Sequence, residues 1–219
     1  MIRALIFDFG GVVTRTLFET HPQSEAALGL PPGTLTWRGP FAPETDAAWR
    51  AMQADEMTER DYWHLRTAEV AALTGHSWTQ MSDFVRAARG AEPLTIIRPE
   101  FLALVSRARS CGLRLAILSN ELDLFYGADI RARLPFLEAF EAIHDATYTR
   151  TLKPDPAAYE AVLHEMDLPG NACLFIDDQQ RNIDGARAVG LQTHHFDVTR
   201  PIACYQAIAT AAGISGDDP

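Results

Sequence analysis

Four polar positions in this sequence carry side chains that could do chemistry together, and three of the four directly follow a short apolar run. They are Asp8, the pair Ser119-Asn120, Lys153 and the pair Asp177-Asp178. Each alone has an ordinary explanation, because acids, serines and asparagines are common in turns and helix caps and most lysines are solvated. Their recurrence at the ends of expected strands is what indicates one shared site.

These side-chain types favour phosphoryl transfer. Carboxylates from two strands form a hard oxygen site of the kind that suits Mg²⁺, and a carboxylate can also act as a covalent nucleophile. The hydroxyl of Ser119 and the amide of Asn120 can donate hydrogen bonds to phosphoryl oxygens. Lys153 can neutralise both a nucleophile and a phosphate as a point charge.

Buried strands are expected to position these side chains. Apolar runs without alternation, typical of a parallel sheet covered on both faces, occupy residues 4–7, 113–118 and 172–176, and a fourth strand is expected at 191–196. Helical patterns occupy residues 99–110, 156–166 and 183–189. This alternation predicts an α/β fold with a Rossmann-like doubly wound parallel sheet, in which ligands bind at the carboxyl ends of the strands.

The stretch after the first expected strand has a different character. Amphipathic helical patterns occupy residues 44–54, 58–75 and 77–91, with Thr58 and Ser77 as expected N-caps and Gly75 as a C-cap. We therefore predict a discontinuous α/β core, residues 1–14 and 96–219, and an inserted helical cap domain, residues 15–95. All four tryptophans fall in the insertion, and most of them are expected in its core.

Composition narrows the possible partners and location. The net charge is −10 and no cluster of basic residues occurs, so a nucleic-acid partner is not expected. No apolar run is long enough to span a membrane and the N-terminus does not resemble a signal peptide, so we expect a cytoplasmic protein. Monomer and homodimer both remain open.

Neither the cysteines nor the adjacent histidines predict a metal site. The three cysteines are far apart and form no Cys-x-x-Cys pair, and Cys173 is expected in the core. His194 and His195 lie in the last expected strand, where neighbouring side chains point to opposite faces. We expect them to be ordinary strand residues.

Four motifs, LIFDFGGVV, LAILSN, LKPDPAAY and CLFIDDQQRNIDGARAVG, resemble in order those of the haloacid dehalogenase (HAD) superfamily, a large family of Asp-based phosphatases and relatives. The helical insertion resembles the cap domain of that family. Within it, the chain resembles small phosphatases such as glucose-1-phosphatase and the N-terminal domain of soluble epoxide hydrolase. The segment AWRAMQADEMTERDYW matches the cap segment of those proteins.

The resemblance implies a role for each motif residue that contacts substrate. Asp8 would be the nucleophile and would form an aspartyl-phosphate. Ser119 would hold a phosphoryl oxygen with Asn120 beside it, and Lys153 would stabilise the charge between Asp8 and the phosphate. The implied substrate is a small phosphorylated metabolite.

The resemblance also implies a Mg²⁺ site. Its ligands would be Asp8, the backbone carbonyl of Gly10 and Asp178, with Asp177 supporting or sharing the ion. Asn182, one turn into the following helix, would help to orient the site.

Gly10 is a departure from the family pattern, because most phosphatases of the family carry a second Asp there. Glycine keeps the carbonyl but loses the side chain that acts as general acid and base, a contribution typically of about 10²–10⁴-fold. We expect that the preferred leaving group needs little protonation, as in a sugar-1-phosphate or an acyl phosphate, or that a cap residue or water supplies the proton. Gly11 is expected to serve the geometry of the turn.

Two other functions stay open. A 2-haloacid dehalogenase also uses an Asp nucleophile without the second Asp, and Arg38 lies near the cap position where those enzymes keep an arginine, while Tyr159 follows Lys153 at a compatible distance. Asp177 and Asp178 argue against it, because an uncompensated acid pair would repel Asp8. A non-catalytic HAD-like binding or regulatory protein is the other alternative. A phosphorylatable receiver domain is excluded, since its acid pair would come first in the chain.

Overall fold

The computed structural model describes residues 1–89 and 93–214, and the chain forms two compact units. The first unit combines Met1–Arg15, Ile97–Leu122 and the residues from Leu134 onward. The second contains Thr16–Ile96 and Asp123–Arg133. Contacts thus group residues 123–133 with the helical insertion, whereas the sequence-based division placed them in the α/β core.

The first unit is built on a five-stranded sheet in which every pairing is parallel. Its strands are β1 (Ala4–Phe7), β2 (Arg114–Ser119), β3 (Ala142–Asp145), β4 (Cys173–Asp177) and β5 (Gln192–His195), in the spatial order β3-β2-β1-β4-β5. The predicted α/β class is confirmed. Strand β3 was not predicted, because half of its sequence, Ala-Ile-His-Asp, is polar and it lies at the edge of the sheet.

Strand register brings the polar positions to one edge of the sheet. Phe7 of the central strand β1 is in register with Ile117 on one side and Ile176 on the other. The backbone N–H of Asp8 continues this pairing by donating to the carbonyl of Ile176 at 2.8 Å. Leu118 of β2 and Asp177 of β4, which follow Ile117 and Ile176, therefore flank Asp8.

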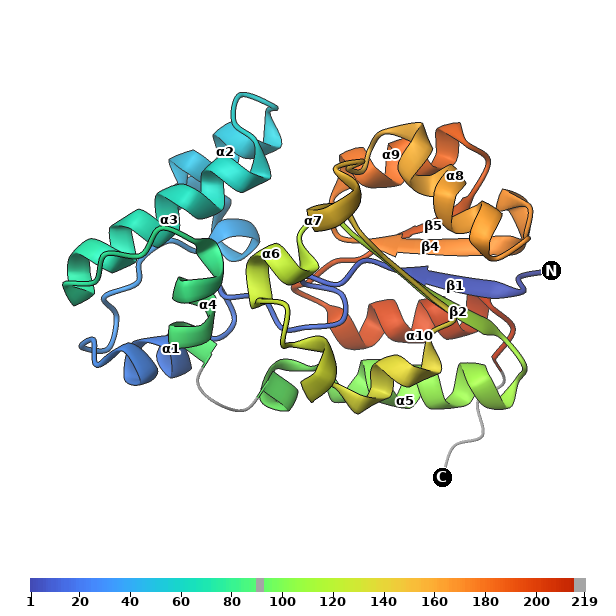
Figure 1. The fold of residues 1–219 in the computed structure, drawn as a ribbon, viewed down its shortest axis with the longest axis horizontal. Helices are drawn as coiled ribbons and strands as arrows, with labels where there is room; N and C mark the ends of the chain where they lie inside the picture. The colour runs from blue at the N-terminus through green and yellow to red at the C-terminus, as the bar shows by residue number, and fades with distance from the viewer. Residues whose placement is uncertain (90–92, 215–219) are drawn as a thin grey trace. The chain divides into compact units, whose positions relative to one another are not determined.

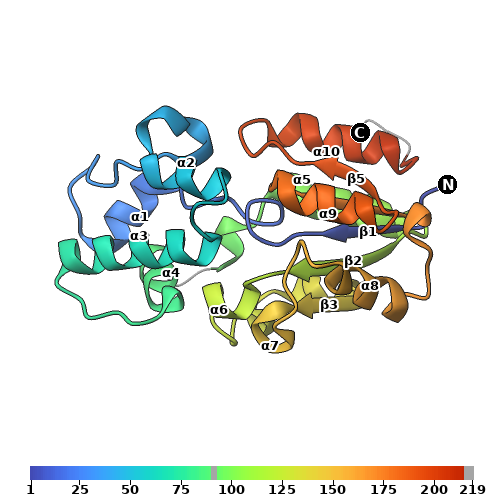
Figure 2. The ribbon, with the colours of Figure 1, turned by 90° about the horizontal axis from the view of Figure 1, so that it is seen from above.

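Helices cover both faces of the sheet, as a doubly wound fold requires (Figure 1). Helices α5 (Pro99–Ser110) and α10 (Pro201–Ala211) pack together on one face. Helices α8 (Pro156–Glu165) and α9 (Gln180–Ala188) cover the other, with α8 against β2 and β3 and α9 against β4 and β5 (Figure 2). Because both faces are covered, the strands read in the sequence as continuous apolar runs.

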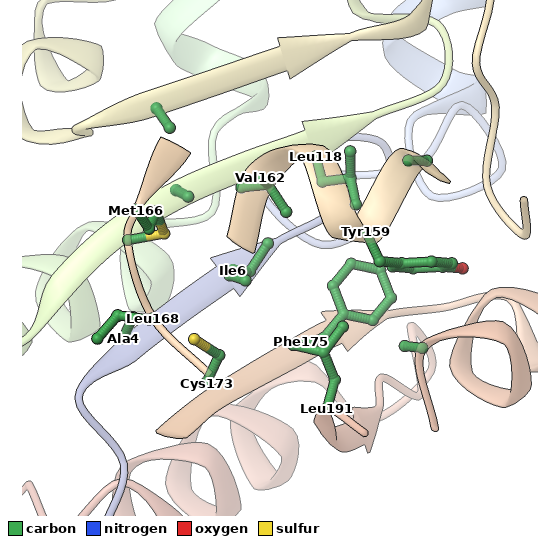
Figure 3. Packing of buried hydrophobic residues seen from close by; sticks show 14 of the residues in the cluster. Ala4, Ile6, Leu118, Tyr159, Val162, Met166, Leu168, Cys173, Phe175 and Leu191 are labelled. Atoms are coloured by element: carbon green, nitrogen blue, oxygen red, sulfur yellow. The ribbon is translucent and has the colours of Figure 1, made fainter. Parts of the chain in front are cut away.

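The core beneath α8 and α9 is a continuous apolar layer (Figure 3). Tyr159 of α8 meets Phe175 of β4 edge to face, with ring centroids 5.5 Å apart, a separation typical of aromatic pairs. Cys173 is buried in the same layer, as predicted. A rigid layer at this place supports the two loops that carry the polar residues.

The remaining short helices within residues 1–89 and 93–214 are α6 (Leu122–Tyr126), α7 (Ala146–Thr149) and six 3₁₀ turns. The 3₁₀ turns span Gly39–Phe41, Pro43–Thr45, Pro93–Ile96, Arg131–Arg133, Pro135–Ala139 and Gly170–Ala172. No helix among the described residues is long and apolar enough to cross a membrane.

The described part of the insertion contains four α-helices: α1 (His21–Leu28), α2 (Ala47–Gln53), α3 (Glu59–Thr74) and α4 (Met81–Arg89). Thr58 caps α3 by accepting from the backbone N–H of Asp61 at 3.1 Å, and Gly75 ends it with a φ of +70°, both as predicted. Ser77 is not an N-cap, because α4 begins at Met81. Helix α1 was not predicted, since its sequence HPQSEAAL has little amphipathic pattern.

An aromatic cluster and one buried acid hold the second unit together. Phe18 lies 5.2–5.5 Å from the rings of Trp37, Trp49 and Trp63. Asp46, whose side chain is fully buried, accepts hydrogen bonds from Tyr62 at 2.8 Å and from Arg66 at 2.6 Å. Asp46 also caps α2 by accepting from the backbone N–H of Trp49. Trp37 and Trp49 are buried, whereas Trp63 and Trp78 are half-buried, so only half of the tryptophans, and not most of them, lie in the core.

Candidate active site

Lys153 lies between two carboxylates at the carboxyl edge of the sheet. Its Nζ donates to Asp8 Oδ1 and to Asp177 Oδ2, both at 2.7 Å. The side chains of Lys153 and Asp177 are almost entirely buried, whereas Asp8 is 13% exposed. Burial alone would lower the pKa of Lys153, but the charges of Asp177 and Asp8 outweigh it and raise the pKa above its ordinary value. The lysine is therefore charged at any working pH.

Asp177 is surrounded by donors. Besides Lys153, it accepts from the backbone N–H of Gln179 at 2.8 Å and from Nδ2 of Asn182, which lies 3.1 Å from each carboxylate oxygen. Four donor contacts on two oxygens use most of the accepting capacity of a carboxylate. Asp177 thus fixes Lys153 on one side and the start of α9 on the other.

Asp178 is half-buried and faces the turn after β1. A Cβ placed on Gly11 would lie only 2.8 Å from Oδ2 of Asp178. Gly11 also has a φ of +75°, so the turn needs glycine for its conformation and for the close approach of this carboxylate. The predicted role of Gly11 in turn geometry is confirmed, and its second role beside Asp178 was not foreseen.

Asp8, Asp177 and Asp178 form a cluster that could hold a metal ion, with one oxygen from each lying within 4.8 Å of the others. Three carboxylates and one lysine give this cluster a formal charge of −2. Hard oxygen donors and an excess of two negative charges fit a divalent cation such as Mg²⁺. Asn182 contributes a further polar atom, since its Oδ1 is buried and has no hydrogen-bond partner among the described residues.

Gly10 differs from its neighbour. A Cβ built at this position meets no atom within 4 Å, and its φ is not in the left-handed region. Neither packing nor backbone conformation therefore requires glycine here. The missing side chain is a chemical feature of the site.

Two residues that sequence reasoning missed hold the turn after β1. The Nε of the buried Arg98 donates to the carbonyl of Gly11 at 3.0 Å, and the hydroxyl of Tyr205 donates to the carbonyl of Val12. These partners lie 87 and 193 residues away in the sequence. No local pattern could have indicated them.

Ser119 and Asn120 lie at the end of β2, beside the lysine loop. Ser119 is buried as the last residue of the strand. Asn120 places both atoms of its carboxamide on the backbone of Lys153: Oδ1 accepts from the N–H at 2.7 Å and Nδ2 donates to the carbonyl at 3.0 Å. The side chain predicted to lie beside the phosphate is engaged with the lysine loop.

Helix α9 packs closely on that same loop. A Cβ on Gly185 would lie 2.8 Å from Pro154 Cβ and 3.0 Å from the hydroxyl of Tyr159. The Tyr159 hydroxyl donates to the carbonyl of Asn182 at 2.8 Å. Tyr159 is fully buried, and its hydroxyl is engaged by this contact with α9.

Lys153 is the only lysine in the sequence. The other lysine-or-arginine positions, out of 19 in all, are arginines. A chain that uses arginine everywhere else retains lysine where a compact ammonium group contacts two buried carboxylates. Arginine, with its planar guanidinium, cannot present the same point charge in that space. This contrast in composition is a sequence signal that would have singled out Lys153 without its motif.

The other predicted positions are distributed as follows. Arg38 belongs to the second unit, where it is exposed and its Nη1 lies 3.1 Å from Nδ1 of His21. His195 is more than a strand residue, because its Nε2 lies 3.0 Å from the backbone carbonyl of Asp178. It helps to fix the peptide that presents this acid.

The fold is thus a doubly wound parallel α/β sheet with an acid after its central strand and a lysine and an acid pair beside that acid. The chain belongs to the haloacid dehalogenase-like hydrolase family, whose model matches residues 2–190. The predicted superfamily is thus confirmed.

Relatives of different activity resemble the chain. It is 36% identical to the plasmid-encoded protein CbbY of Cupriavidus necator, over 88% of this chain and 77% of that one. It is 26% identical to haloacetate dehalogenase H-2 of Moraxella sp., over 87% and 84%. A solved structure of the HAD family enzyme bt-2542 from Bacteroides thetaiotaomicron, in complex with magnesium and inorganic phosphate, has a TM-score of 0.55 at 18% identity and covers 90% of this chain and 96% of that one.

Proposed function

We propose that this protein is a Mg²⁺-dependent phosphatase that transfers the phosphoryl group of a small phosphorylated metabolite to Asp8 and then to water. The observation that carries the proposal is the excess of carboxylate at the site: Asp8, Asp177 and Asp178 face a single lysine. An anionic substrate can approach Asp8 only if a bound cation compensates these charges. The phosphate- and magnesium-bound structure of bt-2542, which shares the fold, supports the same reading.

The acidic residues of the site have two separate roles: some bind the metal ion, and one binds Lys153. Since Asp177 is buried and surrounded by donors, we assign the ion to Asp8, Asp178 and the backbone carbonyl of Gly10. Asp177 then serves Lys153 and only supports the metal site. When bound, Mg²⁺ would neutralise carboxylate charge and polarise a phosphoryl oxygen.

Asp8 supplies the nucleophile in the proposed first step. Its carboxylate oxygen forms a bond to phosphorus while the bond from phosphorus to the leaving oxygen breaks, which gives an aspartyl-phosphate and the released alcohol or acid. Lys153 compensates the charge shared by Asp8 and the phosphoryl group, and the Ser119 hydroxyl donates to a phosphoryl oxygen. In the second step water attacks phosphorus, which releases inorganic phosphate and restores the carboxylate.

Gly10 limits the leaving groups that this site handles well. Without a side-chain acid at this position, an oxygen that must be protonated as it leaves is disfavoured. The proposed substrates are accordingly metabolites with a good leaving group, such as sugar-1-phosphates or acyl phosphates. Water or a residue of the helical insertion, proposed here as a substrate-covering cap, is the other source of the proton.

Dehalogenation is a second candidate, because Gly10 lacks the acid and because haloacetate dehalogenase H-2 is a relative. It is disfavoured by the same carboxylate cluster, which has no use in a reaction that needs no cation. A non-catalytic role is disfavoured by the intact contacts between Lys153, Asp8 and Asp177, which a pure binding protein would not require.

One comparison separates these candidates. The phosphatase is expected to hydrolyse p-nitrophenyl phosphate with added Mg²⁺, to stop when the ion is chelated, and to lose activity in Asp8→Asn. The dehalogenase would instead release chloride from 2-chloropropionate without metal. Absence of both reactions, followed by the same absence across a panel of phosphorylated metabolites, would support the non-catalytic alternative.

A further inference from the structure

We propose that Asn120 is a positioning residue, whose side chain sets the place of Lys153 and does not itself bind the phosphate. The proposal rests on the proposed function for its kinetic consequence and on the geometry of Lys153 for the rest. It also replaces the role that the sequence indicated for this side chain.

The contact between Asn120 and Lys153 has two points. The carboxamide accepts from the N–H and donates to the carbonyl of one and the same residue, at 2.7 and 3.0 Å. A two-point contact fixes both the position and the orientation of the Lys153 backbone. Neighbouring strands of a sheet fix each other through the same pair of N–H and carbonyl groups. These two bonds take one of the two N–H donors and one of the two lone pairs of the carboxamide, and they fix the direction of the group toward the lysine loop.

The backbone of Lys153 itself takes no part in the turn that closes its loop, in which the N–H of Asp155 donates to the carbonyl of Leu152 at 2.9 Å. The residue lies between α7 and α8, outside any strand, and no backbone group is hydrogen-bonded to its N–H or carbonyl among the described residues. At the other end of the side chain, Nζ must meet Asp8 and Asp177 together. Asn120 thus fixes the backbone of Lys153, while the ammonium group at the end of the same side chain contacts Asp8.

The effect of losing this constraint follows from geometry. When the loop can shift, Nζ can no longer keep two contacts of 2.7 Å at once, and the lysine becomes more accessible to solvent. A catalytic group displaced by about 1 Å can cost on the order of 10²-fold in rate. Binding of phosphate through Ser119 and the metal site should be much less affected.

The unique lysine makes the displacement directly measurable. Lys153 and the amino terminus carry the only primary amines of the chain, so an acylating reagent such as a succinimidyl ester can modify just these two positions. In the unmodified protein Lys153 should react far more slowly than the amino terminus, since its side chain is 1% exposed. In Asn120→Ala we expect its acylation rate, relative to the amino terminus, to rise by about tenfold or more.

Two thiols separate local displacement from general loosening. Cys173 is buried in the core of the same unit and Cys111 is exposed. A local effect leaves Cys173 unreactive toward a maleimide while Cys111 reacts normally. Asn120→Asp, which keeps the size and the acceptor but loses the donor to the Lys153 carbonyl, serves as a second variant and should show a smaller rise.

The kinetic arm distinguishes positioning from phosphate binding. We expect Asn120→Ala to lower kcat by about 10–100-fold while KM and the inhibition constant of inorganic phosphate change by no more than about threefold. Ser119→Ala, as the contrast, should raise the phosphate inhibition constant without changing the acylation of Lys153. An unchanged acylation rate in both Asn120 variants, or a phosphate constant that rises tenfold with Lys153 still protected, would overturn the proposal. If the parent protein hydrolysed no phosphate ester, the proposed function would fail, yet the acylation measurement would still decide the role of Asn120.

Discussion

Gly10 and Gly11 are adjacent in the sequence and have unrelated functions. Gly11 adopts a left-handed conformation and leaves room for the carboxylate of Asp178, so its need for glycine is structural. Gly10 has neither constraint. A Cβ therefore fits at Gly10 without a clash, which makes it a residue where a side chain can be added to the site without disturbing the fold.

We predict that Gly10→Asp raises kcat on simple alkyl phosphates. The new side chain would restore a general acid, which is worth at most about 10²–10⁴-fold, and there is space for its Cβ. Activity on p-nitrophenyl phosphate, whose leaving group needs little protonation, should change much less. Gly10→Ala is the matched control, since it adds the Cβ without the acid, and steady-state kinetics on both substrates provide the measurement. An equal gain in Gly10→Ala, or none in a folded Gly10→Asp, would contradict this account of Gly10.

Site residues could be predicted from the sequence where a polar side chain stands next to an apolar run. Asp8 and the pair Asp177-Asp178 directly follow apolar runs, and this change of residue type is visible in the sequence. The roles of Arg98 and Asn120 could not be predicted, because they arise from backbone groups that come close only after folding. The sequence indicates which side chains are present at the site but not which of their atoms are already engaged.

At the scale of elements, strands β1, β2 and β4 could be predicted to within a residue because burial on both faces makes them continuous apolar runs. Strand β3, at the edge and half polar, has no such signal. Helix α9 begins at Gln180, three residues before its predicted start, because its first turn is held by contacts with Asp177. Element boundaries therefore depend on the site as well as on local pattern.

The helices of the second unit are joined by Asp46, and its removal is expected to destabilise that unit strongly. Asp46→Ala leaves Tyr62 buried without its acceptor, leaves Arg66 with only the half-exposed Glu69, and removes the cap of α2. Breaking a buried ion pair typically costs about 3–5 kcal/mol. Chemical denaturation followed by tryptophan fluorescence measures this unit, because all four tryptophans lie within Thr16–Ile96.

Asp129 offers the matched comparison. It pairs with Arg86 in the same unit, but both side chains are 54% exposed. Exposed pairs contribute about 0–1 kcal/mol, so Asp129→Ala should leave the denaturation midpoint almost unchanged. Equal losses in the two variants would show that Asp46 is not the organising residue that its contacts indicate.

At the scale of the whole molecule, acid sensitivity is expected to involve His21, a buried histidine of the second unit. Burial, followed by the charge of Arg38, lowers the pKa of His21 to about 4. An unfolded histidine binds its proton near pH 6.5, so between these values the unfolded state holds more protons. Stability should consequently fall as pH falls from about 6.5 to 4, by on the order of 2 kcal/mol once solvent screening is allowed for.

His21→Gln tests this prediction, because glutamine stays neutral throughout the range. The unfolding free energy of each protein is measured by tryptophan fluorescence. As the pH is lowered, the unfolding free energy of the variant should rise relative to that of the parent protein. The carboxylates titrate in both proteins and cancel in the difference. A difference that does not vary with pH would contradict the buried neutral state of His21.

Phosphorylation of Asp8 tests the central proposal most directly. Tryptic cleavage after Arg3 and Arg15 releases a peptide in which Asp8 is the only acidic residue. After acid quench of the enzyme turning over a phosphate ester with Mg²⁺, we predict one phosphoryl group on this peptide, removable by hydroxylamine as an acyl phosphate is. It should be absent without the metal and in Asp8→Asn. Turnover that persists in Asp8→Asn, or a phosphoryl group found on a different peptide, would contradict the account.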